Sequence, residues 1–179
     1  RTVNKIINKD VEYHFKDVAP SVSLSSTGTL TLLNGLTTGD TDQTRQGKKV
    51  TVKSIQLGGT VSTTTEDTVV RAMLVYDKQA NGDAPSILDI LTAKEPGAFK
   101  NLDNRKRFII LMDRVIPLSL NEGASVRKVE YYKRHNLPVI YNQGTAGTIS
   151  DISTGSIYLI LFATVSCLSS VKARIRFLP

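Results

Sequence analysis

The last strand-like segment of the chain places a positive charge at every second residue. Between residues 171 and 177 the sequence reads VKARIRF, in which Lys172, Arg174 and Arg176 alternate with apolar residues. Successive side chains of a β-strand point to opposite faces, so this segment predicts one apolar face and one basic face. Cations spaced along a strand suit contacts with phosphates, which carry no base sequence information. These three residues are therefore our first candidates for nucleic-acid binding.

Further basic residues gather in short clusters along the chain. The sequence carries 23 Lys and Arg against 16 Asp and Glu, a net charge of +7, which favours a polyanionic partner. Solvent-exposed strand ends explain any one cluster about as well as phosphate binding does, but they explain five clusters together less well. Tyr131 and Tyr132 lie among the charges and could stack on unpaired bases, although core packing is the commoner role of a strand Tyr. The further candidates are Arg1, Lys5, Lys48, Lys49, Lys53, Arg105, Lys106, Arg107, Arg127, Lys128, Lys133 and Arg134.

No combination of residues predicts catalysis, a metal site or a cofactor. The two histidines, His14 and His135, read as surface residues, and the single cysteine, Cys167, reads as a buried, inert thiol. Asp40 and Asp42 could hold calcium, but an ordinary turn explains them better. The sequence contains no P-loop, dinucleotide fingerprint or nucleophile elbow. The apolar run over residues 157–168 is too short to span a bilayer. We expect neither an enzyme nor a membrane protein.

Short runs rich in Thr, Val and Ile, separated by turn signals, predict strands throughout. One short helix is expected in SILDILTA, with Ser86 as its N-cap. This pattern predicts one domain over residues 1–179, an all-β, eight-stranded antiparallel jelly roll (a β-sandwich) with that helix in a loop. The expected strands cover residues 11–17, 48–62, 68–78, 107–118, 125–134, 137–142, 156–166 and 171–177, and TLTLL is a further short candidate.

Three details of this arrangement can be predicted. The apolar phase shifts between Val52 and Ile55, and Gly58-Gly59 follows, which indicates a bulge or bend. Residues 157–165 are apolar on both faces of the predicted strand, which indicates a central strand or one covered by a neighbouring subunit. In a jelly roll the first and last strands are adjacent, so the basic face should lie beside the polar residues of the first strand, Glu12, His14 and Lys16.

Three segments resemble the coat proteins of small circular single-stranded DNA viruses, especially the geminivirus-like group. They are RQGKKVTVKSIQLGGTV (residues 45–61), NLDNRKRFIILMDR (residues 101–114) and LPVIYNQGTAGTISDISTGSIYLILFAT (residues 137–164). Their order and spacing match that family from about Lys48 to Phe177, whereas the N-terminal third of the chain differs most from the family pattern.

The resemblance implies a capsid protein that assembles into a small icosahedral shell of about sixty copies, in the simplest case, around single-stranded DNA. It implies residence in the virion, and in the host nucleus during assembly. Family members usually carry an arginine-rich arm, which we expect before residue 1. Two alternatives remain open at this point. One is the capsid protein of a small positive-strand RNA virus or satellite, and the other is a cellular jelly-roll module such as a lectin or cupin.

Overall fold

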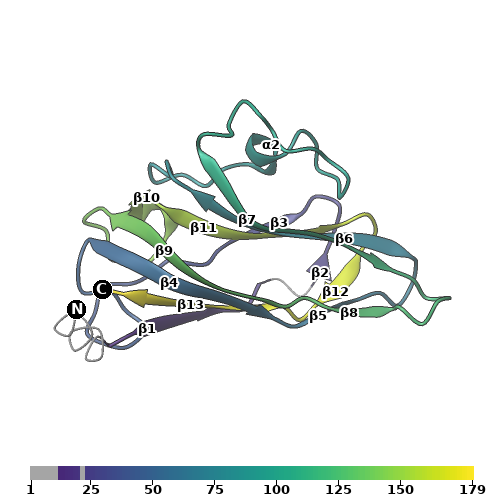
Figure 1. The fold of residues 1–179 in the computed structure, drawn as a ribbon, viewed down its shortest axis with the longest axis horizontal. Helices are drawn as coiled ribbons and strands as arrows, with labels where there is room; N and C mark the ends of the chain where they lie inside the picture. The colour runs from purple at the N-terminus through teal and green to yellow at the C-terminus, as the bar shows by residue number, and fades with distance from the viewer. Residues whose placement is uncertain (1–11, 21–22) are drawn as a thin grey trace, which may run out of the picture.

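The computed structural model describes residues 12–20 and 23–179, and these residues form an antiparallel all-β fold. Figure 1 shows the chain as a flattened, elongated body, with the helix α2 (Ile87–Ile90) above the sheets. Within the described residues there are thirteen strands in three sheets, so the expectation of eight strands in two sheets is met only in part. The first sheet contains, in order, β1 (His14–Val18), β13 (Lys172–Leu178), β4 (Lys49–Gly58), β9 (Tyr131–Tyr141) and β10 (Ile152–Thr154). The second sheet contains β3 (Thr29–Leu32), β11 (Ser156–Ala163), β6 (Thr68–Asp77) and β7 (Phe108–Leu118). The third sheet contains β2 (Ser23–Leu24), β12 (Cys167–Ser169), β5 (Thr60–Ser62) and β8 (Val126–Lys128).

The short strands of the third sheet adjoin the long strands of the first sheet along the chain. Gly59 separates β4 from β5 and has a φ of +150°, a conformation that L side chains rarely adopt. A Cβ at Gly59 would lie 2.6 Å from the Cα of Val171, in the break between β12 and β13. The predicted bend after residue 57 is therefore confirmed, and close approach of two backbones requires glycine there.

The apolar faces of the sheets meet in the main core. Val171, which precedes β13, and Ala173, Ile175 and Phe177 within it are at most 2 % exposed, as the alternation of the sequence predicts. Phe177 and the neighbouring Ile175 pack with Val52 and Ile55 of β4 in the same buried cluster. Burial of these side chains fixes the register of β13, because a slip of one residue would turn the basic residues into the core.

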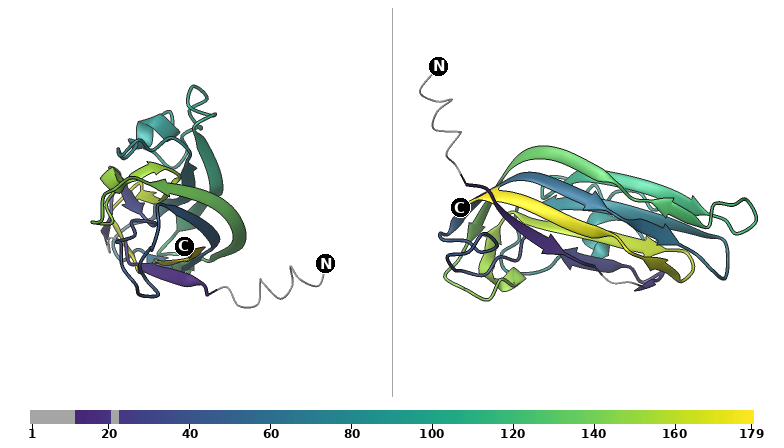
Figure 2. Two further views of the ribbon diagram at one scale, coloured as in Figure 1. Left: turned by 90° about the vertical axis from the view of Figure 1, so that its left-hand side faces the viewer. Right: turned by 90° about the horizontal axis from the view of Figure 1, so that it is seen from below.

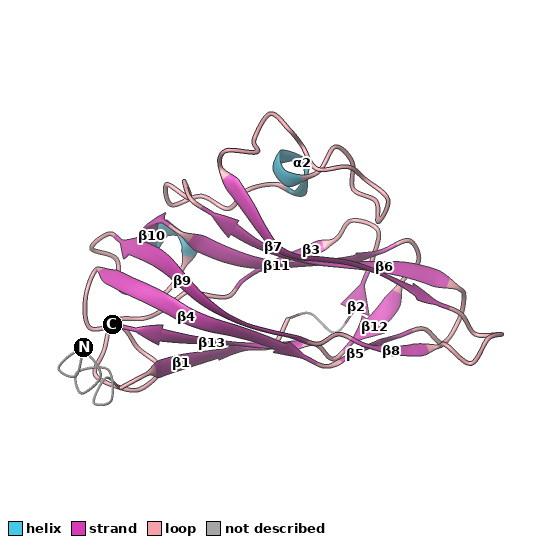
Figure 3. Cartoon of the chain, viewed as in Figure 1, coloured by secondary structure: helices cyan, strands magenta, loops and turns pink. Residues whose placement is uncertain are grey.

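A second, smaller core lies on the other face of β6 and β11. The chain between β6 and β7, which we call the α2 segment (residues 78–107), covers this face with the helix α2 (Ile87–Ile90) and its flanking loops (Figures 1 and 3). β11 is buried at all eight positions for this reason. Its cover comes from the same chain, so a neighbouring subunit is not needed to explain its apolar residues. The buried members of this cluster are Met73, Val75, Ile87, Ile90, Leu91, Ala98, Phe108, Tyr158, Ile160 and Phe162.

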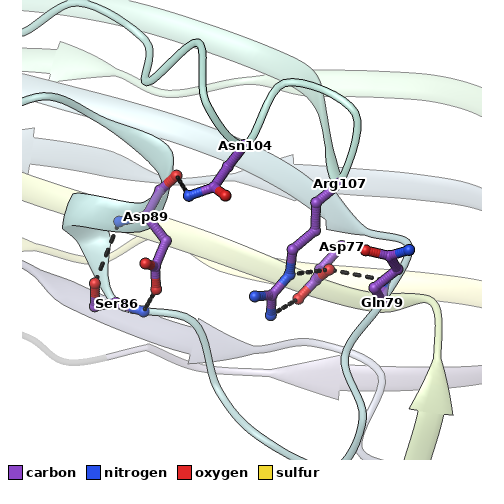
Figure 4. Close-up of polar contacts among 6 residues, drawn as sticks. All are labelled: Asp77, Gln79, Ser86, Asp89, Asn104 and Arg107. Atoms are coloured by element: carbon purple, nitrogen blue, oxygen red, sulfur yellow. Dashed lines mark hydrogen bonds and ion pairs between the residues drawn. The ribbon is translucent and has the colours of Figure 1, made fainter.

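Polar contacts hold the α2 segment in place. The expected N-cap is confirmed: the Ser86 hydroxyl accepts from the Asp89 backbone N–H, and the Asp89 carboxylate accepts from that of Ser86 (Figure 4). The Asn104 amide donates to the Asp89 carbonyl at 2.9 Å. Farther along, Arg71 of β6 donates to the carbonyls of Pro96 and Ala98 at 3.0 and 2.6 Å.

β9 runs through a position where the sequence analysis expects a gap between two strands. It extends from Tyr131 to Tyr141 without interruption, and the break falls earlier, between β8 and β9. Pro138 can lie within it because β10 pairs only with Ile140 and Tyr141, so β9 has no second neighbour at the proline. The Pro138 carbonyl instead accepts from the Tyr76 hydroxyl at 2.6 Å.

Candidate nucleic-acid interface

The basic side chains of the last strand lie on the exposed face of the five-stranded sheet. β13 is placed between β1 and β4, and β9 follows on the other side of β4. The view from below in Figure 2 looks onto these strands side by side. We call their exposed surface the basic face; it carries Lys53, Arg134, Lys172, Arg174 and Arg176.

Arg174 is held by an acidic neighbour on the first strand. Its Nε and Nη2 each donate to an oxygen of Asp17, both at 2.6 Å, and its Cζ lies 5.0 Å from the ring centre of Phe15. The hydrogen bonds and the positive charge of the guanidinium hold the pKa of Asp17 below its ordinary value. Both side chains are about half exposed. The charge of Arg174 is therefore compensated within the protein.

The first strand presents the opposite face from the one that the sequence predicts. β1 does lie beside β13, but Phe15 pairs with Arg176 and Asp17 with Arg174. His14 points inward: it is 7 % exposed, and its ring centre lies 5.6 Å from that of Phe177. The prediction that His14 is a surface residue is wrong, and so is the prediction that the basic residues lie beside Glu12, His14 and Lys16. Polar and aromatic residues occur on both faces of this edge strand, so alternation alone did not identify its buried side.

Two guanidinium-bearing residues flank a small residue at the centre of the basic face. Arg176 pairs with Ser54, and Ser54 pairs with Arg134 of β9. Residues directly opposite one another share a face, so the three form one row across three strands. Among the described residues, neither Arg176 nor Arg134 takes part in an ion pair. The short side chain of Ser54 leaves room between the two longer ones.

A β-bulge opens a hollow beside this row. The register of β4 shifts between Val52 and Ser54 against both β13 and β9, which confirms the predicted irregularity. Lys53 is the unpaired residue, and its Nζ lies 2.5 Å from Oδ1 of Asn136. Bulges commonly redirect a side chain at functional sites. The hollow has a volume of about 310 Å³ and is lined by Tyr13, Lys53, Ser54, Tyr132, Arg134, His135 and Arg176.

The two adjacent tyrosines of β9 have different surroundings. Tyr132 is 58 % exposed and lines the hollow, whereas Tyr131 is half-buried, with its hydroxyl 3.0 Å from Nε2 of His135. Burial raises the pKa of Tyr131 and, with the charge of Lys133, lowers the pKa of His135. Tyr132 is therefore accessible to a ligand. Tyr13, 52 % exposed, lines the same hollow; the sequence analysis missed it because it assigned Tyr13 to the buried face.

The predicted cluster at residues 105–107 lies away from the basic face. It belongs to the α2 segment, which covers the second sheet on the opposite side of the molecule (Figure 1). Arg107 donates from Nε and Nη2 to the fully buried carboxylate of Asp77, at 2.9 and 2.7 Å (Figure 4). The hydrogen bonds to Asp77 raise the pKa of Arg107. Arg107 thus anchors the α2 segment, while Arg105 and Lys106 are exposed.

The other candidate residues are distributed around the ends of the sheets. Lys48 and Lys49 are exposed where β4 begins, and Arg127 and Lys128 are exposed in β8. Lys133 pairs with the core residue Ile55, so it points away from Arg134. Arg1 and Lys5 lie outside the described residues.

The described part of the chain holds no group of three or more His, Cys, Asp or Glu residues that could bind a metal ion. Asp40 instead accepts from the Gln46 amide at 2.6 Å. Cys167 is buried, and burial raises the pKa of its thiol, which favours the unreactive protonated form. In residues 12–20 and 23–179, no helix has the length and apolar character needed to cross a membrane.

A family model described as "Geminivirus coat protein/nuclear export factor BR1 family" matches residues 5–178. The chain belongs to this family. Membership confirms the resemblance carried by the three sequence segments, and it identifies a capsid protein whose place is the virion. Coat proteins of this family are structural proteins rather than enzymes, which agrees with the expectation drawn from the sequence.

One solved structure similar to this chain is titled "Structure of infectious bursal disease virus Gt strain". The two chains are 12 % identical and superpose with a TM-score of 0.27. The match covers 93 % of this chain and 32 % of that one, so the chain spans about a third of its length. A search of curated proteins finds no match.

Proposed function

We propose that this coat protein assembles into a closed icosahedral shell and packages single-stranded DNA against its basic face. The observation that carries the proposal is the row of Arg176, Ser54 and Arg134 beside the Lys53 bulge, in a chain of the geminivirus coat protein family. The family match favours this function over an RNA-virus capsid or a cellular lectin or cupin. Assembly in the host nucleus is part of the same proposal.

A jelly roll is the fold that we propose for such a shell. Four pairs of strands follow one another along the chain with only short breaks: β1 with β2, β4 with β5, β8 with β9, and β12 with β13. Their neighbour orders correspond, since β1-β13-β4-β9 is matched by β2-β12-β5-β8. If each pair is counted as one bent strand, eight long strands in two sheets account for the core, with β10 as a short addition.

The basic face would act by neutralising phosphates. Lys53, Arg134, Lys172 and Arg176 carry charges that no described carboxylate compensates by an ion pair. Contacts of this kind release counterions and do not depend on base sequence. Many copies of the face on the inner wall of a shell would offset the mutual repulsion of a packed genome.

Exposed apolar side chains of the α2 segment are candidates for contacts between subunits. Phe99 and Leu102 are 82 % and 66 % exposed, and Leu88 is 48 % exposed. Their backbone is nevertheless fixed: the Phe99 carbonyl accepts from the Thr92 N–H at 2.9 Å, and the Asn101 N–H donates to Ile90 at 2.8 Å. A rigid loop that displays large apolar side chains is typical of protein–protein contacts.

The packaging function is tested by the salt dependence of binding to a 20-nucleotide thymidine oligomer. If Arg176 and Arg134 each contact one phosphate, replacing both with Gln should reduce the slope of log K against log salt by about 1.4, since each contact on a single strand contributes about 0.7. The variant R105Q/K106Q loses the same charge on the other side of the molecule and serves as the matched control. Equal slopes for both variants would contradict the assignment of the basic face.

A further inference from the structure

The hollow on the basic face combines two features that phosphate neutralisation does not require. Two tyrosines line it, Tyr13 and Tyr132, and each is more than half exposed. Tyr13 precedes β1 and Tyr132 lies in β9, so the rings come from opposite sides of the four-strand span β1-β13-β4-β9. The cations of Arg176, Lys53 and Arg134 lie on the strands between and beside them.

The sheet is locally distorted at this point. The register shifts of β4 against β13 and against β9 both fall at Lys53, and Ser54 is the smallest side chain in the lining. An unbroken ladder with longer side chains would fill this volume. The distortion instead leaves a recess of about 310 Å³ between charged groups and aromatic rings. A recess with these walls fits a planar ring system joined to an anion.

We infer that this hollow is a stacking subsite for unpaired nucleobases, in which Tyr13 and Tyr132 contact base faces while Arg134, Arg176 and Lys53 contact the adjoining phosphates. The inference rests on the proposed function, because it assumes that the basic face meets nucleic acid. Aromatic stacking accepts every base, since each has a π-face. A duplex keeps its base faces stacked within the helix, so the subsite selects single strands without selecting a sequence.

Three 20-mers separate stacking from phosphate binding. They are a thymidine oligomer, an abasic oligomer that has the same backbone without bases, and a duplex of mixed sequence. Affinities are measured by fluorescence anisotropy on the unassembled chain over a series of salt concentrations, and the oligomers are compared at equal salt. The wild type should bind the thymidine oligomer about 5- to 160-fold more tightly than the abasic one, the range expected for one stacked base. The chain has six Tyr and no Trp, so quenching of its tyrosine emission by the thymidine oligomer alone gives a second readout.

Variants then assign the effect to the two rings. Y13L/Y132L should abolish the preference for the thymidine oligomer while its affinity for the abasic oligomer stays within about twofold. Y132F keeps the ring and should keep the preference, which excludes a role for the hydroxyl. F99L removes an aromatic ring that is 82 % exposed on the α2 segment and should change neither affinity.

Two different results would separate the failure of this inference from that of the proposed function. If the wild type binds thymidine and abasic oligomers equally, with a steep salt dependence, the face binds phosphates but the stacking subsite is wrong. The same conclusion follows if Y132L alone weakens binding to both oligomers in equal proportion. If no oligomer binds, or binding is independent of salt, the proposed packaging face itself is contradicted.

Discussion

Arg174 and Arg176 lie two residues apart on one strand face, yet their charges have different surroundings. Asp17 accepts hydrogen bonds from Nε and Nη2 of the Arg174 guanidinium, whereas no described carboxylate pairs with Arg176. The sequence alternation could not reveal this difference, because Asp17 lies 157 positions away along the chain. Arg176 is therefore the stronger candidate for a phosphate contact, and Arg174 serves in part to join β1 to β13.

Removal of the Asp17 charge should strengthen nucleic-acid binding. D17N frees the guanidinium of Arg174, so the salt slope for a thymidine oligomer should rise by about 0.7, which corresponds to one more phosphate contact. Stability should change little, since the pair is exposed to solvent. The measurement is the salt-dependent binding isotherm of D17N beside that of the wild type. An unchanged or weaker affinity would show that Arg174 makes no contact with phosphate.

The lowered pKa of Asp17 gives the ion pair a defined pH dependence. A carboxylate whose pKa is depressed by folding stabilises the native state above its unfolded-state pKa, and this contribution is lost as pH falls through the folded-state value. The pair should therefore contribute constantly at neutral pH and disappear only in acid. NMR titration of the Asp17 carboxyl should give a pKa below the ordinary 3.8, and R174Q should return it towards that value. An ordinary pKa in the wild type would contradict the pairing.

At the scale of the strand, one face of β13 packs in the core and the other face carries the basic side chains. F177A should lower the free energy of unfolding by about 3–5 kcal/mol, because it leaves a cavity in the core, where Phe177 is fully buried. R176A on the opposite face should change it by no more than about 0.5 kcal/mol. Urea denaturation of both variants, with oligonucleotide binding measured in parallel, tests the division. A destabilisation by R176A comparable to that of F177A would contradict it.

A largely buried arginine of β6 helps to hold the α2 segment in place. Arg71 donates to both oxygens of Asp113 at 2.8 and 2.9 Å and to the carbonyls of Pro96 and Ala98, while it is only 6 % exposed. R71M removes the donor of these four hydrogen bonds and leaves the Asp113 carboxylate with only the Lys100 ammonium, 3.9 Å away, so it should destabilise the protein by about 3 kcal/mol. Hydrogen exchange should also accelerate in residues 91–101 more than in β13. Uniform acceleration over the chain would indicate that Arg71 has no special role in that segment.

The elements differ in how far the sequence could predict them. β13, the N-cap at Ser86 and the bulge near Lys53 were predictable because alternation, capping chemistry and a phase shift are local signals. The orientation of β1 was not, since contacts with distant residues decide which side of an edge strand is buried. The hollow also lay beyond local reasoning, because its lining comes from four separate segments of the chain. Basic composition thus predicts a polyanionic partner, but it could not show which cations lie together on one face.

At the scale of the whole molecule, the two sides of the sandwich carry different surfaces. The basic face lies on one side, and the α2 segment with its exposed apolar residues lies on the other (Figure 1). F99S/L102S should lower the fraction of chain in large assemblies, because it removes exposed apolar contacts, while the monomer's stability changes by no more than about 0.5 kcal/mol. Light scattering across a concentration series tests this, with oligonucleotide binding as a control that should not change. Normal assembly of the variant would exclude this patch as a subunit contact.

The measurement that tests the central claim most directly is sedimentation velocity with absorbance recorded at 260 and 280 nm. About sixty copies of the 19.6 kDa chain would form a protein shell of about 1.2 MDa. The proposed function predicts a particle of at least that mass with excess absorbance at 260 nm, from which nuclease-protected single-stranded DNA can be recovered. A slowly sedimenting species of one to a few chains that carries no nucleic acid would contradict it.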